Sequence, residues 1–287
     1  MMIKLSKIVG LLNRTVSNHG TRWGITNIGK RQLHAAARAA ANRQARVELA
    51  VAHRQMDSLG FSEGVCNHLT MMAPATDRDG EVMLVCAHET HWSKVTASSL
   101  VGLDEDMSVV EDFIGGQKVD VAAATIHSGI RKVRKELKCV MHAHLPYATT
   151  LGNIKESRLL MIHQNMLRFY KGVAYDENYD GWAECVTEGQ RLGECLGKDN
   201  DILMMCNHGA ITTGGRVAAA FDKMYYLERA AMFQVMALST NRELRMIPED
   251  ICRKTYELSR HGMERYIDAH FTGVMNVVTS VTPDVLD

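Results

Sequence analysis

Met141-His142-Ala143-His144 ends the apolar run Lys138-Cys139-Val140-Met141, which predicts a buried strand. Side chains alternate across a strand, so His142 and His144 are expected to point the same way, close enough to bind one ion. A second apolar run, residues 202–206, ends in Asn207-His208-Gly209. Two strand ends that deliver three histidines would form a facial triad with open coordination positions. That arrangement is typical of a catalytic metal site rather than a closed structural one.

A His-x-His pair alone is weak evidence for a metal site, because histidines also serve as hydrogen-bonding residues of cores and surfaces. His208, at a strand end and before a turn glycine, strengthens the metal interpretation. Imidazole is a borderline ligand that suits zinc, so zinc or another divalent metal is the expected cofactor. A redox-active Fe(II) centre at the same three histidines stays open as an alternative.

Hydrophobic periodicity around this stretch predicts alternating strands and helices. Further strands are expected at 64–72 and 81–87, paired as a hairpin through Asp77-Arg78-Asp79-Gly80, and at 108–113. Helices are expected at 35–59, 121–136, 147–151, 181–196, 216–246 and 251–270. Gly60 is expected to end the first helix and Pro248 the long one, with a loose tail at the end of the chain.

Composition sets the outer bounds. The chain has 287 residues, enough for one large or two small domains, and 46% of them are hydrophobic, so a sizeable core is expected. Thirty-three basic and 33 acidic residues give a formal net charge of zero, which gives no reason to expect nucleic acid or an acidic membrane as a partner. No apolar run approaches the roughly 20 residues of a membrane helix. The seven cysteines form no Cys-x-x-Cys pair, which favours free thiols in a reducing compartment.

The first 40 residues differ from the rest. No Asp or Glu precedes Glu48, basic residues are frequent, and residues 2–12 are mostly apolar. This composition is typical of a mitochondrial transit peptide, whereas the alternatives are a solvated basic arm or a start codon placed too far upstream. We expect a basic extension at 1–40, a main domain at 41–246 and a C-terminal helix and tail at 247–287. The expected location is cytoplasmic or mitochondrial.

Several motifs together resemble the class II aldolase/adducin family. They are the segments Met141-His-Ala-His-Leu-Pro-Tyr-Ala-Thr149, Asn207-His-Gly-Ala-Ile-Thr-Thr-Gly214 and Cys66-Asn67-His68-Leu69-Thr70. Residues 95–101 and 170–175 resemble the adducin-like branch more closely. The resemblance covers about residues 45–240 in the right order. It implies an α/β fold, a three-layer αβα sandwich with a central mixed or antiparallel sheet, and a homotetramer with sites between subunits.

The resemblance also implies site residues. His142, His144 and His208 match the family's metal ligands. The candidate substrate-binding residues are Asn67, Thr70, Ser98 and Gln164. Taken without the family, Asn67 and Thr70 would be turn-making and strand-pairing residues, and Ser98 would belong to a turn or helix start.

Three positions depart from the family's aldolases. Glu89-Thr90 stands where those enzymes have a Ser/Thr-Gly phosphate loop, and a carboxylate there would repel phosphate. Ala123 stands four residues before His127, where they carry the acid–base glutamate, and His163-Gln164 stands where they place a catalytic tyrosine. His127 is the candidate replacement base, since the pKa of histidine suits neutral pH. The alternative is a histidine that orients the helix against the sheet.

The resemblance therefore implies a metal-dependent lyase, with zinc the expected ion, that acts on a small hydroxy-carbonyl or sugar-derived substrate through a metal-stabilised enediolate. Aldolase, epimerase, dehydratase and decarboxylase reactions all pass through such an intermediate, and a fold does not choose among them. The alternative is a non-catalytic, adducin-like scaffold or oligomerisation module. The chain ends too early for the basic tail by which adducins bind the membrane skeleton, so actin or spectrin is not an expected partner.

Overall fold

The computed structural model describes residues 27–179, 181 and 186–287. The chain divides into two units, Met1–Ala37 and Arg38–Asp287. In the first unit the described residues belong to helix α2 (Asn27–Ser58), which begins eight residues before the helix predicted at 35–59. The targeting segment proposed for the basic start of the chain lies mostly outside the described residues.

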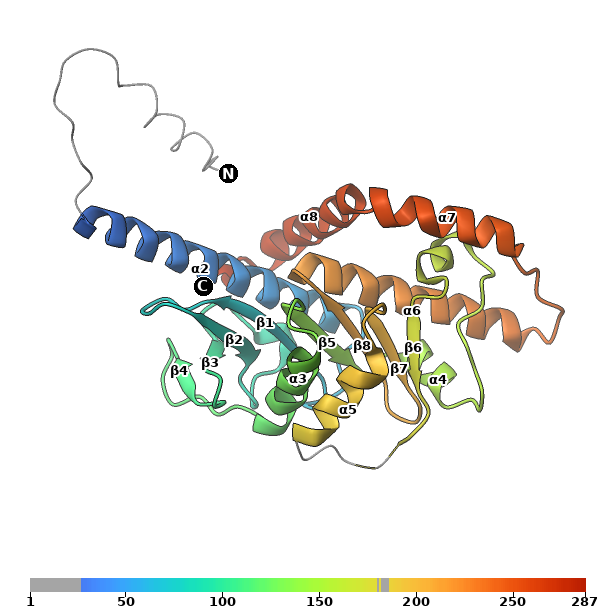
Figure 1. The fold of residues 1–287 in the computed structure, drawn as a ribbon, viewed down its shortest axis with the longest axis horizontal. Coiled ribbons are helices and arrows are strands. Elements are labelled where there is room, and N and C mark those ends of the chain that lie inside the picture. The colour runs from blue at the N-terminus through green and yellow to red at the C-terminus, as the bar shows by residue number, and fades with distance from the viewer. Residues whose placement is uncertain (1–26, 180, 182–185) are drawn as a thin grey trace, which may run out of the picture. The chain divides into compact units, whose positions relative to one another are not determined.

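A single mixed sheet forms the centre of the larger unit (Figure 1). Its strand order is β4-β3-β2-β1-β5-β8-β7-β6, and every neighbouring pair is antiparallel except the parallel pair β6–β7. The strands are β1 (His68–Pro74), β2 (Glu81–Cys86), β3 (Leu100–Leu103), β4 (Val109–Glu111), β5 (Cys139–Ala143), β6 (Val173–Asp176), β7 (Ile202–Met205) and β8 (Ala210–Gly214).

Helices cover both faces of this sheet, which confirms the predicted α/β sandwich (Figure 1). The helices after α2 are α3 (Val121–Val133), α4 (Pro146–Gly152), α5 (Val186–Leu196), α6 (Val217–Ser239), α7 (Glu249–Gly262) and α8 (Glu264–Val281), with short 3₁₀ turns η1 (Trp92–Lys94), η2 (Gln164–Phe169) and η3 (Pro283–Leu286). Helices α3 and α5 lie on one face, and the second half of α2 lies with α6 and α8 on the other.

Alternation along β5 decides which way its histidine points. Met141 and Ala143 belong to the core beneath α2 and α6, whereas Val140 belongs to the core beneath α3 and α5. His142, two residues after Val140, therefore faces α3 and α5. Helices α3 and α5 pack backbone to backbone. The contact is so close that a Cβ on Gly189 would lie 2.5 Å from the carbonyl oxygen of Ile126.

Some predicted boundaries were right. Strands β1 and β2 pair as the expected antiparallel hairpin. Helix α2 ends at Ser58, and the predicted capping residue Gly60 has a φ of 72°. There the N–H of Phe61 bonds the carbonyl of Met56 and the N–H of Gly60 bonds that of Asp57, the pattern of a Schellman motif.

Other boundaries were wrong. Strand β1 starts at His68, after a turn, and the predictions missed β3, β6 and β8, whose short runs carry little periodic signal. The long helix α6 ends at Ser239 instead of Met246, and Asn241 beyond it has a left-handed φ of 51°. Its stripe of apolar residues runs out before the predicted end. The expected last helix is two helices, α7 and α8, which meet at Met263.

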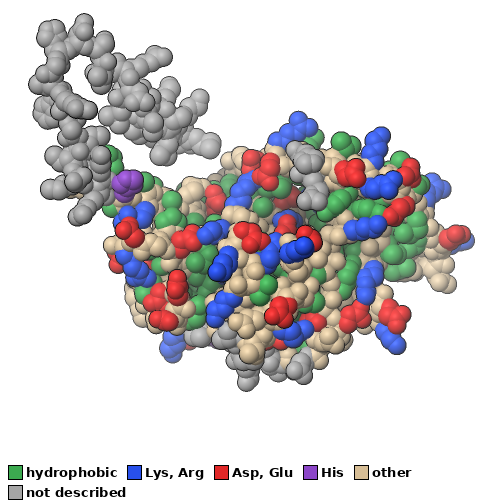
Figure 2. Space-filling view, in the orientation of Figure 1, with side chains coloured by type: hydrophobic (Ala, Val, Ile, Leu, Met, Phe, Trp, Pro, Cys, Tyr) green, Lys and Arg blue, Asp and Glu red, His purple; other side chains and the backbone are tan. Residues whose placement is uncertain are grey.

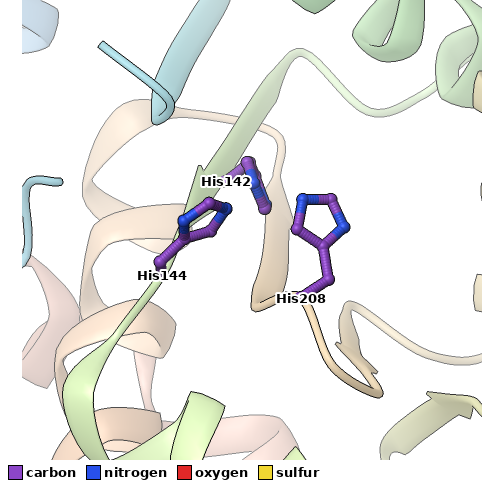
Figure 3. Close-up of side chains that lie close together, drawn as sticks. All are labelled: His142, His144 and His208. Carbon is purple, nitrogen blue, oxygen red and sulfur yellow. The ribbon is translucent and has the colours of Figure 1, made fainter. Parts of the chain in front are cut away.

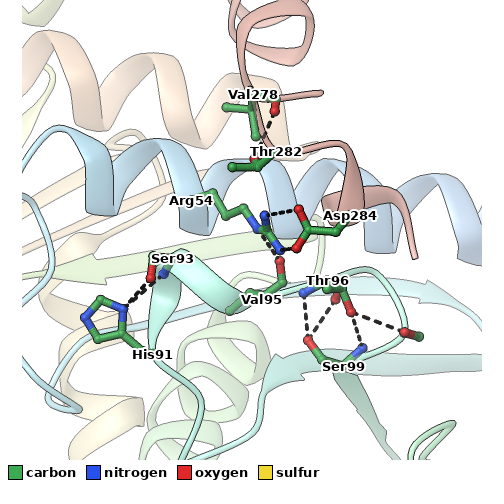
Figure 4. Close-up of polar contacts among 10 residues, drawn as sticks. Arg54, His91, Ser93, Val95, Thr96, Ser99, Val278, Thr282 and Asp284 are labelled. Carbon is green, nitrogen blue, oxygen red and sulfur yellow. Dashed lines mark hydrogen bonds and ion pairs between the residues drawn. The ribbon is translucent and has the colours of Figure 1, made fainter. Parts of the chain in front are cut away.

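The end of the chain is docked rather than loose (Figure 4). The Arg54 guanidinium on α2 donates to both carboxylate oxygens of Asp284 at 3.0 and 2.8 Å, and its Nε donates to the carbonyl of Val95 at 2.7 Å. Val285 is fully buried, and its carbonyl accepts a hydrogen bond from the N–H of Ala97. The expectation of a loose tail failed because these partners lie far away in the sequence.

The visible surface carries charged side chains of both signs, and the described cysteines form no disulfide. Basic and acidic side chains intermingle over the face seen in Figure 2. The described cysteines are all free thiols. Among helices of the described residues, none combines the length and apolar character that a membrane crossing needs.

Candidate metal centre

Three histidine rings converge at one end of the sheet (Figure 3). His142 comes from β5, His144 follows that strand, and His208 comes from the turn between β7 and β8. One ring nitrogen from each lies within 4.8 Å of the other two. Nitrogens around one tetrahedral zinc lie about 3.3 Å apart, so small ring rotations are needed to close on an ion. The predicted shared face of His142 and His144 is confirmed.

The β7–β8 turn is shaped to deliver His208. Asn207 adopts a left-handed φ of 52°, a conformation that asparagine tolerates better than most residues. Gly209 then packs against the neighbouring strand, where a Cβ would lie 2.7 Å from the carbonyl oxygen of Ala143 and 2.9 Å from the His144 ring. A larger residue than glycine would push the ring of one ligand away from the others.

Hydrogen bonds select the ring nitrogens that face the centre. The Nδ1 of His142 lies 3.1 Å from the carbonyl oxygen of Ala210, an acceptor only, so this Nδ1 carries the proton. The Nδ1 of His144 bonds the Glu63 carboxylate. Both rings therefore present the lone pair of Nε2, as metal-binding histidines do when the other nitrogen has an acceptor.

The Nε2 of His144 is the observation that fits a metal best. It is buried, and no described group is its hydrogen-bond partner. A buried polar atom without a partner is costly in a folded protein, so such an atom needs an explanation. The donor set, three imidazole nitrogens with a carboxylate behind one of them, suits a divalent transition metal.

Burial keeps His142 and His208 in the form that binds metal. Desolvation lowers the pKa of His142 well below 6.5, and the neighbouring histidines lower it further. Burial also lowers the pKa of His208, against the opposing charges of Glu188 and Asp176. Neutral imidazole is the ligand form, so protons compete weakly with a metal at neutral pH.

A cavity of about 700 Å³ opens beside the three histidines. Its polar wall includes Glu63, His68 and Asp120, and its apolar wall includes Ile126 and Leu192. Among the described residues that line it, none is lysine or arginine. The cavity therefore offers room for a small molecule next to the ligands, and its described wall offers no lysine or arginine for a phosphate group.

None of the four candidate substrate-binding residues is among those that line this cavity. Thr70 is fully buried on β1, and the Asn67 side chain accepts a hydrogen bond from the N–H of Glu63 at 2.7 Å, which helps to fix the loop before β1. Ser98 lies in the turn before β3, 3.2 Å from the hydroxyl of Thr96. Gln164 is exposed at the start of η2. Neither Ser98 nor Gln164 lines the cavity.

The candidate base His127 is fully buried and is not among the residues that line the cavity. Its Nδ1 lies 2.7 Å from the hydroxyl of Thr70 and its Nε2 lies 2.8 Å from the Nδ1 of His68. With both nitrogens engaged inside the protein, His127 has the placement of an orienting residue.

Two residues of the site were missed from sequence. His68 is the cross-strand partner of His142, and the two ring centroids are 4.8 Å apart. Glu63 supplies the carboxylate behind His144. The spacing of His68 and Thr70, two residues apart on one strand, was a signal for a shared face, whereas nothing in the sequence connects Glu63 with a histidine 81 residues away.

Comparison with known proteins identifies the family. Residues 47–235 match the model of the class II aldolase and adducin N-terminal domain. The chain belongs to this family. The "Putative aldolase class 2 protein" of Pseudomonas aeruginosa is 34% identical over 212 residues, which cover 74% of this chain and 78% of the relative.

The chain also aligns with solved structures of the class II aldolase fold. An aldolase II superfamily protein from Pseudomonas syringae aligns with a TM-score of 0.78 at 29% identity, over 86% of this chain and 96% of that one. The L-fuculose 1-phosphate aldolase from Glaciozyma antarctica aligns with a TM-score of 0.73 at 20% identity, over 94% and 96% of the two chains, which shows a shared fold. The chain is thus a class II aldolase-like domain whose histidine triad is consistent with metal binding.

Proposed function

We propose that this protein is a metal-dependent lyase-type enzyme in which His142, His144 and His208 hold one divalent ion, with zinc the best candidate. The partnerless, buried Nε2 of His144 carries this proposal, because it is aimed at the other two rings and has no other described use. When bound, the ion would supply a Lewis acid that stabilises negative charge on adjacent oxygens of an enediolate formed from the substrate.

The chain's own residues prepare the site for such a substrate. Ala210 and Glu63 hold the ligand rings with their Nε2 atoms inward. The apolar wall of Ile126 and Leu192 keeps water from one side of the cavity, which strengthens polar interactions there. Three protein ligands leave coordination positions open, as in catalytic zinc sites.

The proposed substrate is a small hydroxy-carbonyl compound or hydroxy acid without phosphate. Glu63 and Asp120 line the cavity, and no described lysine or arginine does. Two carboxylates beside the ligands would repel a doubly charged phosphate group. The apolar wall would instead accommodate a short hydrocarbon portion of the substrate.

Metal content tests the proposal first. Protein purified without an affinity tag is analysed for bound elements, next to the double variant His142→Ala/His144→Ala. The matched control is His34→Ala/His91→Ala, which removes two histidines that are exposed and outside the cavity. About one zinc per chain is expected in the wild type and the control, and none in the double variant. No metal in the wild type, and no uptake of added zinc, manganese or iron, would sink the proposal.

Turnover tests the reaction class. The zinc-loaded protein is incubated with short hydroxy aldehydes, hydroxy ketones and hydroxy acids, each with and without a phosphate group, and products are followed by NMR. We expect carbon–carbon cleavage, epimerisation or dehydration of an unphosphorylated compound. Faster turnover of the phosphorylated partner in each pair would contradict the substrate class.

A non-catalytic, adducin-like scaffold is the second candidate. It is favoured by Ala123 at the position of the aldolase glutamate and by the absence of Gln164 from the residues that line the cavity. The homotetramer expected for the family belongs to either proposal. Adjacent exposed side chains, Phe113 and Ile114, offer apolar surface for a second copy. Light scattering on the eluting protein gives the subunit number, and a monomer at micromolar concentration would exclude the tetramer.

A further inference from the structure

Four side chains form a continuous hydrogen-bonded chain that ends beside the candidate metal centre. The Arg131 guanidinium lies 2.6 Å from the hydroxyl oxygen of Thr70. That oxygen lies 2.7 Å from the Nδ1 of His127, and the Nε2 of His127 lies 2.8 Å from the Nδ1 of His68. His68 lines the cavity and faces His142 across the strand pair β1–β5.

The chemistry of the first member orders the protons along this chain. Arginine has donors and no acceptor, so the Thr70 oxygen accepts from Arg131. Thr70 is fully buried, and the only other described partner of its hydroxyl is the Nδ1 of His127. The hydroxyl therefore donates to His127, since the reverse direction would leave a buried O–H without an acceptor, at a cost of about 1–3 kcal/mol.

The same reasoning passes through the second ring. A neutral His127 that accepts at Nδ1 carries its proton on Nε2 and donates it to the Nδ1 of His68. A neutral His68 that accepts at Nδ1 must then carry its own proton on Nε2. Its Nδ1 and its Nε2 are both unavailable as metal ligands, one because it accepts a hydrogen bond and the other because it is protonated.

We propose that Arg131, Thr70 and His127 hold His68 as its Nε2–H tautomer, which makes His68 a hydrogen-bond donor to a substrate oxygen beside the metal and not a fourth ligand. This inference rests on the proposed function for the identity of the substrate oxygen, while the tautomer itself does not. Thr70, His127 and Arg131 are positioning residues, and His68 is the one that contacts the substrate.

The placement explains two features of the site. The rings of His68 and His142 are in contact, with centroids 4.8 Å apart. The three residues whose ring nitrogens converge are nevertheless His142, His144 and His208. The chain has Ala123 in place of the aldolase glutamate, and His68 would supply the site with a hydrogen-bond donor. Asp120 lines the same cavity, and its charge opposes the lowering of the His68 pKa by burial.

Nitrogen NMR on metal-free protein tests the tautomer directly. The protein is labelled with ¹⁵N-histidine, and the His68 signals are assigned as those lost in His68→Gln. At pH 7 we expect neutral Nε2–H rings for both His68 and His127. A Nδ1–H tautomer of His68, or a doubly protonated ring, would overturn the inference.

A substitution within the chain tests its cause. Thr70→Val keeps the shape of the side chain and removes the hydroxyl, so the His68 Nε2–H tautomer should become mixed with the Nδ1–H form. The matched control is Thr212→Val, a fully buried threonine of the same sheet whose hydroxyl bonds the carbonyl of Ala220. An unchanged His68 spectrum in Thr70→Val would show that the chain does not hold the tautomer.

Binding of acetohydroxamate, a small anionic chelator, tests the donor role in zinc-loaded protein. His68→Leu should retain one zinc per chain but bind acetohydroxamate at least about 10-fold more weakly, the value of one hydrogen bond to a charged oxygen. His68→Gln, which retains an N–H donor, should lose less. Loss of zinc from His68→Leu would mean a fourth ligand, and unchanged chelator affinity would exclude the donor role. Wild-type protein that binds no zinc would end the proposed function, whereas the NMR result would still decide the tautomer.

Discussion

Glu63 gives the sharpest test of how the ligand rings are held. Its carboxylate is the acceptor for the Nδ1 of His144, and through that bond it keeps the Nε2 lone pair aimed at the other two histidines. Carboxylates behind metal-binding histidines typically contribute 10- to 100-fold to metal affinity. Glu63→Gln removes the charge and leaves an oxygen that accepts a hydrogen bond, and Glu63→Ala removes both.

The expected size follows from exposure. The Glu63 side chain is 66% exposed, whereas that of His144 is 20% exposed, so water screens the carboxylate's charge. We therefore expect the low end of the range for Glu63→Gln, about 10-fold in the zinc dissociation constant or about 1.4 kcal/mol, and a somewhat larger loss for Glu63→Ala. Added salt should reduce the difference between wild type and Glu63→Gln, because the effect of the charge is screened.

The assay is a zinc competition titration against a chromophoric chelator at pH 7 and fixed ionic strength. Glu105→Gln, an exposed glutamate in the turn between β3 and β4, serves as the matched control and should bind zinc like the wild type. Zinc affinity within about 2-fold of wild type in both Glu63 variants would refute the reasoning that this carboxylate orients His144.

Three further predictions concern stability, measured by denaturant unfolding at one protein concentration. Val285→Ala should cost about 2 kcal/mol, because it removes two buried methyl groups that anchor the chain end, and a neutral result would mean that the end is not docked. Gly189→Ala should cost roughly 1–3 kcal/mol, because its Cβ would meet the Ile126 carbonyl at 2.5 Å; stability equal to wild type would contradict the close helix contact. Burial raises the pKa of Glu228 from 4.5 to about 7, so the folded state binds a proton that the unfolded state has released. Stability should therefore fall by roughly 3 kcal/mol as pH rises from about 4.5 to about 7, and Glu228→Gln should lose this component of the slope.

Local pattern accounts for the parts of the site that lie on single strands and turns. The side chains of Val140, Met141 and His142 alternate between the two faces of β5, and this alternation predicts a shared direction for His142 and His144. Asn207 and Gly209 are typical turn residues, and they predict a sharp chain reversal that contains His208. These features depend on neighbours in the sequence, so a sequence pattern can express them.

The strand boundaries and the position of the chain end depend on contacts between residues far apart in the sequence. Strand β3 has only four residues, and its identity comes from pairing with β2 rather than from periodicity. Asp284, next to the buried Val285, is bound by Arg54, which lies 230 residues earlier and therefore outside any local window of sequence. Non-local contacts of this kind decide whether an apolar residue belongs to a core or to a tail.

By itself, then, the sequence of this protein determined the αβα sandwich, the family motifs and the three candidate ligands. Only the tertiary structure decided what surrounds those ligands. It brought Glu63 behind His144 and linked His68 through His127 to Thr70 and Arg131. The physical reason is that a hydrogen bond depends on distance and direction between atoms, and residues from β1, α3 and the loop before β1 acquire those only when the sheet and its helices pack together.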